Sequence, residues 1–184
     1  ITITAGSLTG TVTITPVVDL IDEFDETVIA DITSVTNGTE NGTQQVITTI
    51  TDSDTEPSVT LTVDQPTIDE NSGIAIVTAT LNTVSAKDII VYLGFSGTAT
   101  GTGTDYSITA DSIIITAGSL TGTTSITSVQ DAIFEGDESI IADITSVTNG
   151  TEDGTQSITT TITDDEGLPQ VTLSIDSTLI QEFG

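Results

Sequence analysis

The chain has 184 residues, and its 28 Asp and Glu against one Lys or Arg give a formal net charge of −27. It contains no histidine and no cysteine, which excludes a Ser-His-Asp triad, a thiolate nucleophile, an ordinary zinc site and a disulfide. The single cation, Lys87, cannot neutralise a row of phosphates or anionic lipid head groups, and no apolar run approaches the length of a membrane span. We therefore expect no enzyme, no nucleic-acid binding and no membrane insertion, and we expect cations as partners.

A repeat with a period of 112 residues organises the chain. The segment ITAGSLTG at 3–10 returns at 115–122, and laying residues 1–72 over 113–184 matches 45 of the 72 positions without a gap. Acid-rich linkers end at Pro57 and Pro169, where proline stops strand pairing. The sequence predicts the C-terminal part of one repeat at 1–56 (the partial repeat), a complete repeat at 57–168 and the first strand of a third repeat at 169–184. Two alternatives stay open: sequence neighbours complete the end pieces, or 169–184 pairs with 1–56 in permuted order.

Short alternating runs of β-branched residues predict seven strands in the complete repeat and no helix. In the last of them, Ile158 and Ile162 share one face with Thr160 while threonines fill the other, which is typical of a sheet with one buried face. Glycines at 117–122 and the Asn-Gly and Asp-Gly pairs at 148–154 favour turns. The expected fold is all-β, a seven-stranded antiparallel β-sandwich of the immunoglobulin-like kind, with strands at 58–63, 74–81, 88–95, 112–116, 123–129, 139–146 and 156–163.

Acidic residues follow alternate strands. Because odd-numbered strands of an antiparallel sandwich run the same way, their exits meet at one pole, and that pole receives these acids: Asp64, Asp69, Glu70, Asp105, Asp131, Glu135, Asp137, Glu138, Asp164, Asp165 and Glu166. We call this end of the repeat the acid pole. Lys87 falls at the opposite pole, in a polar loop beside Asp88 where we expect it to be exposed.

Clustered carboxylates repel one another, by roughly 4 kcal/mol for a pair about 4 Å apart at an effective dielectric constant near 20. A cation is the plausible counter-charge, and oxygen ligands without nitrogen or sulfur select a hard ion. Calcium fits best, because it accepts six to eight oxygens in flexible geometry. The EF-hand pattern is absent, since Pro57 stands where DSDTE at 52–56 would need glycine. The alternative reading is an acidic surface that serves solubility.

Three segments of the complete repeat resemble the Calx-beta domain: FSGTATGTGTDY at 95–106, DAIFEGDE at 131–138 and TDDE at 163–166. The resemblance implies a seven-stranded immunoglobulin-like sandwich that binds Ca²⁺ at the acid pole. The ligands it implies in the complete repeat are Glu70, Asp131, Glu135, Glu138, Asp164 and Asp165, and those in the partial repeat are Asp19, Glu23, Glu26, Asp52 and Asp54.

Departures from the family pattern imply fewer ions than in the sodium-calcium exchanger. Ser96 stands where many members have Asp, and Gln130 and Val18 stand where many have a second acid. The resemblance implies a structural role for the pair Asp105 and Tyr106, with Tyr106 in packing.

Tandem, nearly identical Calx-beta repeats resemble the stalks of large bacterial surface adhesins, including gliding adhesins of Bacteroidetes exported by type IX secretion. We therefore expect a calcium-stabilised stalk repeat at the cell surface, outside the cell, in contact with neighbouring repeats of its own chain. One alternative is a calcium-sensing regulatory module. Another is a surface filament or sheath that self-associates laterally through exposed edge strands. A carbohydrate-acting enzyme with Glu135 and Glu138 as its acid pair is disfavoured, because two Tyr and four Phe line few sugar clefts.

Overall fold

The structure is a computed structural model that describes residues 1–101, 103–176, 178–179 and 181–182. Its described residues form strands and loops, and none of them lies in a helix. In the part of the chain that is described, no helical segment has the length and hydropathy of a membrane span. The strands are β1 (Glu26–Asp31), β2 (Gln45–Ile50), β3 (Ser58–Val63), β4 (Thr67–Asp69), β5 (Ile74–Leu81), β6 (Ile89–Gly97), β7 (Tyr106–Ile108), β8 (Ser112–Ile115), β9 (Thr121–Ser128), β10 (Glu138–Thr148), β11 (Thr151–Glu152) and β12 (Ser157–Thr163).

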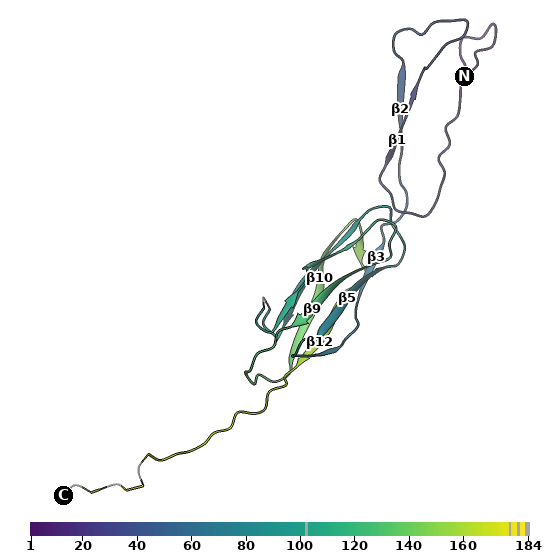
Figure 1. Cartoon of the computed structure of the whole chain (residues 1–184). Coiled ribbons are helices and arrows are strands. Elements are labelled where there is room, and N and C mark those ends of the chain that lie inside the picture. The colour runs from purple at the N-terminus through teal and green to yellow at the C-terminus, as the bar shows by residue number, and fades with distance from the viewer. Residues whose placement is uncertain (102, 177, 180, 183–184) are drawn as a thin grey trace.

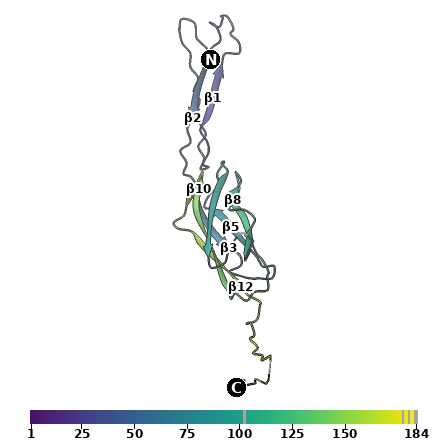
Figure 2. The same cartoon turned by 90° about the vertical axis from the view of Figure 1, so that its left-hand side faces the viewer.

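Two five-stranded sheets of the complete repeat form a sandwich. One sheet has the order β4-β12-β10-β6-β8 and the other the order β11-β3-β5-β9-β7. Most neighbours are antiparallel, while β4 with β12 and β11 with β3 are parallel. The expected all-β sandwich is therefore confirmed, and Figures 1 and 2 show its two layers from perpendicular directions.

The seven expected strands correspond to β3, β5, β6, β8, β9, β10 and β12. The short strands β4, β7 and β11 were not predicted, because two or three residues are too few to show an alternating pattern. Strand β10 pairs with both β6 and β12, and its register against β6 shifts between Ile144 and Ser146. Such a bulge adds one residue to a strand and bends it.

The core lies between the two sheets and consists mainly of isoleucine, with smaller numbers of valine, leucine and alanine. Ile89, Ile113 and Ile140 from one sheet face Val77 and Ile126 from the other, and all five are essentially inaccessible to solvent. Tyr106 belongs to the same core and packs on Phe95, with 6.4 Å between the ring centroids. This burial confirms the expected packing role of Tyr106.

The partial repeat forms the β1–β2 hairpin and a long loop around it. In the complete repeat, the counterparts of these strands are β10 and β12, which are covered by the opposite sheet. The segments that would correspond to β3–β6 have no copy within residues 1–56, so the apolar face of the hairpin has no cover. On this face Val46 is accordingly exposed and Val28 is only partly buried, whereas Ile140 in β10, the counterpart of Val28, is fully buried.

The segment after Pro169 extends away from the sandwich and has no strand among residues 169–176, 178–179 and 181–182. It leaves the end of the sandwich that lies farthest from the partial repeat, and both views agree on this. Its described residues therefore form no permuted sandwich with residues 1–56 within the chain. Its assignment as the first strand of a third repeat stays a prediction, and positions 177, 180, 183 and 184 of that assignment lie outside the described residues.

The expected exposure of Lys87 is wrong. Its side chain is only 12% exposed and its Nζ donates to Asp22 Oδ1 of the partial repeat at 2.7 Å. Segments 19–26 and 51–54 of the partial repeat, which we call its acid loop, lie at the pole of the complete repeat that carries Lys87. This cation is therefore enclosed at the contact between the two repeats. Within one repeat, the sequence offered no sign of this neighbour.

Candidate metal centre

Four loops of the complete repeat meet at the acid pole. Glu70 follows β4, Asp105 precedes β7, residues 130–137 connect β9 to β10, and residues 164–166 follow β12. The parallel pairing of β4 with β12 sets two of these loops side by side, and the Glu70 amide donates to the Thr163 carbonyl at 3.0 Å. Strand direction thus gathers residues that are almost 100 positions apart in the sequence.

Two groups of three carboxylates lie at this pole. The first contains Glu70, Asp165 and Glu166, and within it one carboxylate oxygen from each residue lies within 4.8 Å of the others. The second contains Asp105, Glu135 and Glu138 at the same mutual spacing. Glu70 and Asp105 are buried, while the other members are partly or fully exposed. Each group offers three oxygen atoms to one cation.

A small hollow lies at the second group and also touches Glu70 of the first. Its volume is about 10 Å³, and it is lined by Glu70, Asp105, Glu135, Gly136, Glu138, Ile162 and Asp164. A space of this size holds about one water-sized sphere. Its donors are carboxylate oxygens, and a single hard cation fits this set better than a soft transition metal does.

The predicted ligands Asp131 and Asp164 brace the loops in this structure. Asp131 Oδ1 accepts the amide of Ile133 at 2.7 Å. Asp164 Oδ2 accepts the amides of Glu135 and Gly136 at 3.2 and 2.8 Å, so it fixes the loop that carries Glu135. Asp164 also lines the hollow, whereas Asp131 belongs to neither three-carboxylate group. Their assignment as ligands stays a prediction.

The electrostatics of the pole record the crowding of negative charge. Desolvation, reinforced by the neighbouring Asp105 and Glu135 carboxylates, raises the pKa of Glu138 to about 7. Desolvation and the Asp164 carboxylate likewise raise the pKa of Glu166 to about 7, and desolvation raises the pKa of Glu135 above its usual value. The Gly136 amide and other main-chain amides lower the pKa of Asp164. The main chain therefore stabilises the charge of Asp164, while the crowded acids and desolvation disfavour the ionised forms of the glutamates.

One oxygen at the pole is left without a protein donor. Glu166 Oε2 is buried and has no hydrogen-bond partner among the described residues. The other oxygen of the same carboxylate, Oε1, accepts from Gln130 Nε2 at 3.0 Å, and the same nitrogen lies 3.0 Å from Asp165 Oδ1. A buried carboxylate oxygen without a donor is costly, and a cation would satisfy it. This atom supports the fit of a metal at the pole.

Asp105 and Glu166 were not among the predicted ligands, yet both belong to three-carboxylate groups. Asp105 was assigned a structural role with Tyr106, and it does have one: its Oδ2 accepts the Thr100 amide and its carbonyl accepts the Val129 amide. Its position at the exit of the third expected strand was the available signal. Glu166 lies two residues after Asp164, and the run of three acids offered no means of ranking them.

The partial repeat builds the same loop with the same bonds. Asp19 Oδ1 accepts the Ile21 amide, and Asp52 Oδ2 accepts the Glu23 amide at 3.0 Å, as their counterparts Asp131 and Asp164 do. Asp52 Oδ1 also accepts the Asp54 amide. These bonds recur without the strands that complete the sandwich, so residues 19–26 and 51–54 specify the loop locally.

The predicted ligands of the partial repeat surround an open pocket of about 410 Å³, whose acidic lining residues are Asp19, Glu23, Glu26, Asp52 and Asp54. Among the described residues, no three-carboxylate group of the kind seen at the acid pole occurs here. Residues 1–56 contain no counterpart of Glu70 or Asp105, so the buried members of such groups have no copy in the partial repeat. Desolvation, with repulsion from neighbouring acids, still raises the pKa values of Glu23 and Asp54.

Several solved structures are similar to this chain. Two similar solved structures are the apo form of the Calx CBD1 domain, at 21% identity, 59% coverage of this chain, 98% of that chain and a TM-score of 0.48, and CBD12 from CALX1.2, at 21% identity, 52% coverage and a TM-score of 0.46. The chain spans 40% of the length of the CBD12 structure. A third is WR4, a C. elegans MSP family member, at 11% identity, 56% coverage of this chain, 95% of that chain and a TM-score of 0.35.

No curated protein sequence matches the chain at a significant level. The sequence profile of the Calx-beta domain matches residues 52–166, which include all ten strands of the sandwich and every member of both three-carboxylate groups. The match covers more than half of the chain, and the chain accordingly belongs to the Calx-beta family.

Proposed function

We propose that the chain is a calcium-stabilised stalk segment of a long extracellular surface protein, in which Ca²⁺ at the acid pole of each repeat keeps the array stiff. The observation that carries the proposal is the presence of two three-carboxylate groups at one pole. The second group and Glu70 of the first line a small hollow, and a buried Glu166 oxygen has no donor among the described residues. Membership of the Calx-beta family, for which the resemblance in the sequence implied calcium, supports the choice of ion.

The residues that would hold the ion have separate roles. Glu70 and Asp105 are buried and fixed by the sandwich, so they supply preformed oxygens. Glu135, Glu138, Asp165 and Glu166 lie on loops and are more exposed, so they can adjust to the ion. A bound Ca²⁺ would neutralise the mutual repulsion of these groups and tie the four loops together.

The sequence repeat and the arrangement of the two parts support the stalk. The 112-residue period is the spacing expected of an array of sandwich domains, and the hairpin of the partial repeat lies end to end with the sandwich of the complete repeat (Figures 1 and 2). Extracellular calcium at millimolar concentration suits weak sites of this kind. The absence of histidine and cysteine and the membership of a family of non-catalytic domains favour a structural role over an enzymatic one.

Calcium titration with two readouts tests the proposal. We expect the melting temperature to rise by roughly 10 °C when free calcium exceeds its Kd about a hundredfold. We also expect the maximum dimension from small-angle X-ray scattering to increase or become better defined, with a magnesium titration as the control for general screening. A melting temperature and a scattering profile that both ignore calcium would contradict the stalk proposal.

A further inference from the structure

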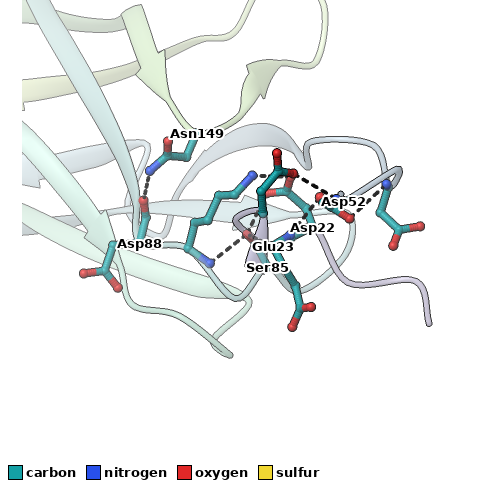
Figure 3. Close-up of polar contacts among 9 residues, drawn as sticks. Asp22, Glu23, Asp52, Ser85, Asp88 and Asn149 are labelled. Atoms are coloured by element: carbon teal, nitrogen blue, oxygen red, sulfur yellow. Dashed lines mark hydrogen bonds and ion pairs between the residues drawn. The ribbon is translucent and has the colours of Figure 1, made fainter. Parts of the chain in front are cut away.

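A single residue of the partial repeat is buried, and it is a charged one. Asp22 is only 2% exposed, while the other residues of 1–56 are partly or fully accessible. Its burial comes from the complete repeat, whose Ser85 is itself 1% exposed. Figure 3 shows Asp22 against Ser85, with Glu23 and Asp52 of the acid loop beside it. A carboxylate enclosed at a contact between two repeats requires partners on the other side.

Those partners are present for every oxygen of Asp22. Lys87 Nζ donates to Oδ1 at 2.7 Å, and the Ser85 hydroxyl lies 2.9 Å from Oδ2. The main-chain oxygen of Asp22 accepts the Ala86 amide at 2.9 Å, and Asp22 and Ser85 form a parallel β-bridge. Lys87 Nζ also lies 5.1 Å from the centre of the Phe24 ring, within the range of a cation–π contact.

The receiving loop is held in place by its own repeat. The Ser85 carbonyl accepts the Gly118 amide at 2.8 Å, and Asp88 Oδ1 accepts the Ala117 amide at 2.8 Å. The Asp88 carbonyl in turn accepts Asn149 Nδ2 at 2.9 Å. Residues 85–88 are therefore fixed by two neighbouring turns, so that they form a preorganised acceptor for Asp22.

Asp22 lies within the acid loop but is not one of its predicted metal ligands. Both of its carboxylate oxygens already have protein partners. The acids on either side of it have identical counterparts 112 residues later: Asp19 matches Asp131 and Glu23 matches Glu135. Asp22 itself becomes Phe134, and Phe24 becomes Gly136. The two copies thus share the acids of the loop and differ at the positions that touch the next repeat.

From this geometry we infer that Ser85, Ala86 and Lys87 form a docking socket for Asp22 of the preceding repeat, and that this clasp fixes the junction without a metal. The inference deepens the proposed stalk function, on which it rests for its biological purpose. The partner is the acid loop of a neighbouring repeat that carries Asp at this position. Phe134 occupies this position in the complete repeat, so its acid pole suits a socket of different, apolar chemistry.

The absence of cysteine makes the clasp directly measurable. Spin labels on Thr39→Cys and Thr62→Cys, both exposed, report the distance between the repeats by pulsed electron resonance. The distance is measured in calcium and in chelator for the full chain, Asp22→Asn, Lys87→Met and the double variant. Phe134→Ala, at the equivalent position of the other acid loop, is the matched control. Isothermal titration calorimetry of the same proteins reports calcium binding.

We expect a narrow distance distribution for the parent chain and for Phe134→Ala, even in chelator. Each single clasp variant should raise the population of detached arrangements by roughly ten-fold or more, because a buried charge loses its partner. The double variant should lose less docking free energy than the sum of the losses in the two single variants. Calcium binding should persist in all of these proteins.

Distributions that stay unchanged in Asp22→Asn and Lys87→Met would overturn the clasp. If they then narrowed only with calcium, the stalk proposal would survive alone. If the clasp variants broadened the distribution while calorimetry detected no calcium binding by the parent chain, the clasp would stand and the calcium-stabilised stalk would fail.

Discussion

At the scale of single residues, the acid pole is a set of carboxylates that repel one another but are held close together by the fold. The sandwich buries Glu70 and Asp105, and main-chain amides hold Asp164, so the loops cannot move apart to relieve repulsion. The raised pKa values of Glu138 and Glu166 are the measurable result. Two predictions belong to this scale.

The first concerns Glu138→Gln. The substitution removes one charge from the second three-carboxylate group and keeps its shape. We expect the calcium-free protein to melt a few degrees higher, because repulsion is relieved. We expect calcium affinity to fall roughly ten-fold or more, since even partners outside the ligand set are worth 10- to 100-fold. Calorimetry and thermal unfolding measure the two effects, and Asp111→Asn, an exposed acid outside both groups, should change neither. A parallel loss of melting temperature and affinity would contradict this account of Glu138.

The second concerns pH. The pKa values of Glu138 and Glu166 are raised from the ordinary 4.5 to about 7 in the folded protein, so the folded state binds protons more tightly than the unfolded state. Their contribution to stability is complete below about pH 4.5 and is lost as pH rises through about 7. In chelator, these groups should therefore cause the melting temperature to fall as the pH rises from about 5 to about 8. In saturating calcium the decrease should vanish or reverse, because the ion requires the ionised carboxylates. A decrease of the same size in both conditions would argue against a metal at this pole.

At the scale of elements, the end of β6 must approach β10 closely to position the loop that leads to Asp105. Gly97 lies at this point with a φ of 127°, and a Cβ there would fall 2.1 Å from the Ser139 carbonyl oxygen. Neither the backbone conformation nor the space accepts a side chain. The glycine therefore serves the site indirectly, by closing the sheet beneath it.

Gly97→Ala should destabilise the complete repeat by about 2 kcal/mol or more, because strain and a main-chain clash act together. Chemical denaturation measures the loss. Gly167→Ala is the matched control, since a Cβ at Gly167 meets nothing within 4 Å and its φ is not strained. Equal stability of the two variants would show that the chain relaxes around Gly97 at little cost.

At the scale of the whole molecule, the buried apolar core belongs to one repeat. Its members run from Val59 to Ile162, and the single buried residue of the partial repeat is Asp22. Hydrophobic burial dominates folding free energy, so the complete repeat should be the cooperative unit.

A fragment of residues 57–168 should therefore melt within a few degrees of the main transition of the full chain under matched calcium concentrations. A fragment of residues 1–56 should show no cooperative transition, because its apolar face has no opposing sheet. Circular dichroism of the two fragments measures both outcomes. A fragment 57–168 that fails to fold would contradict the predicted boundaries of the complete repeat, which the sequence alone proposes.

The sequence predicted the seven longer strands of the sandwich, the all-β fold and the pole that carries the acids, but not the short strands β4, β7 and β11. Alternation of β-branched residues is a local property of the sequence. Once the strands are numbered, their alternating direction shows which loops share a pole, and no knowledge of the packing is needed. The hydrogen bonds that Asp19 and Asp131 accept within their loops were not predicted, although each spans only two residues. Which acids come together became clear from the tertiary structure: Asp105 lies with Glu135 and Glu138, and Glu166 lies with Glu70. Such distances depend on how the two sheets twist and on which carboxylates already accept main-chain hydrogen bonds. Only the structure, likewise, revealed the partner of Lys87, because a contact between two repeats leaves no periodic trace within either of them.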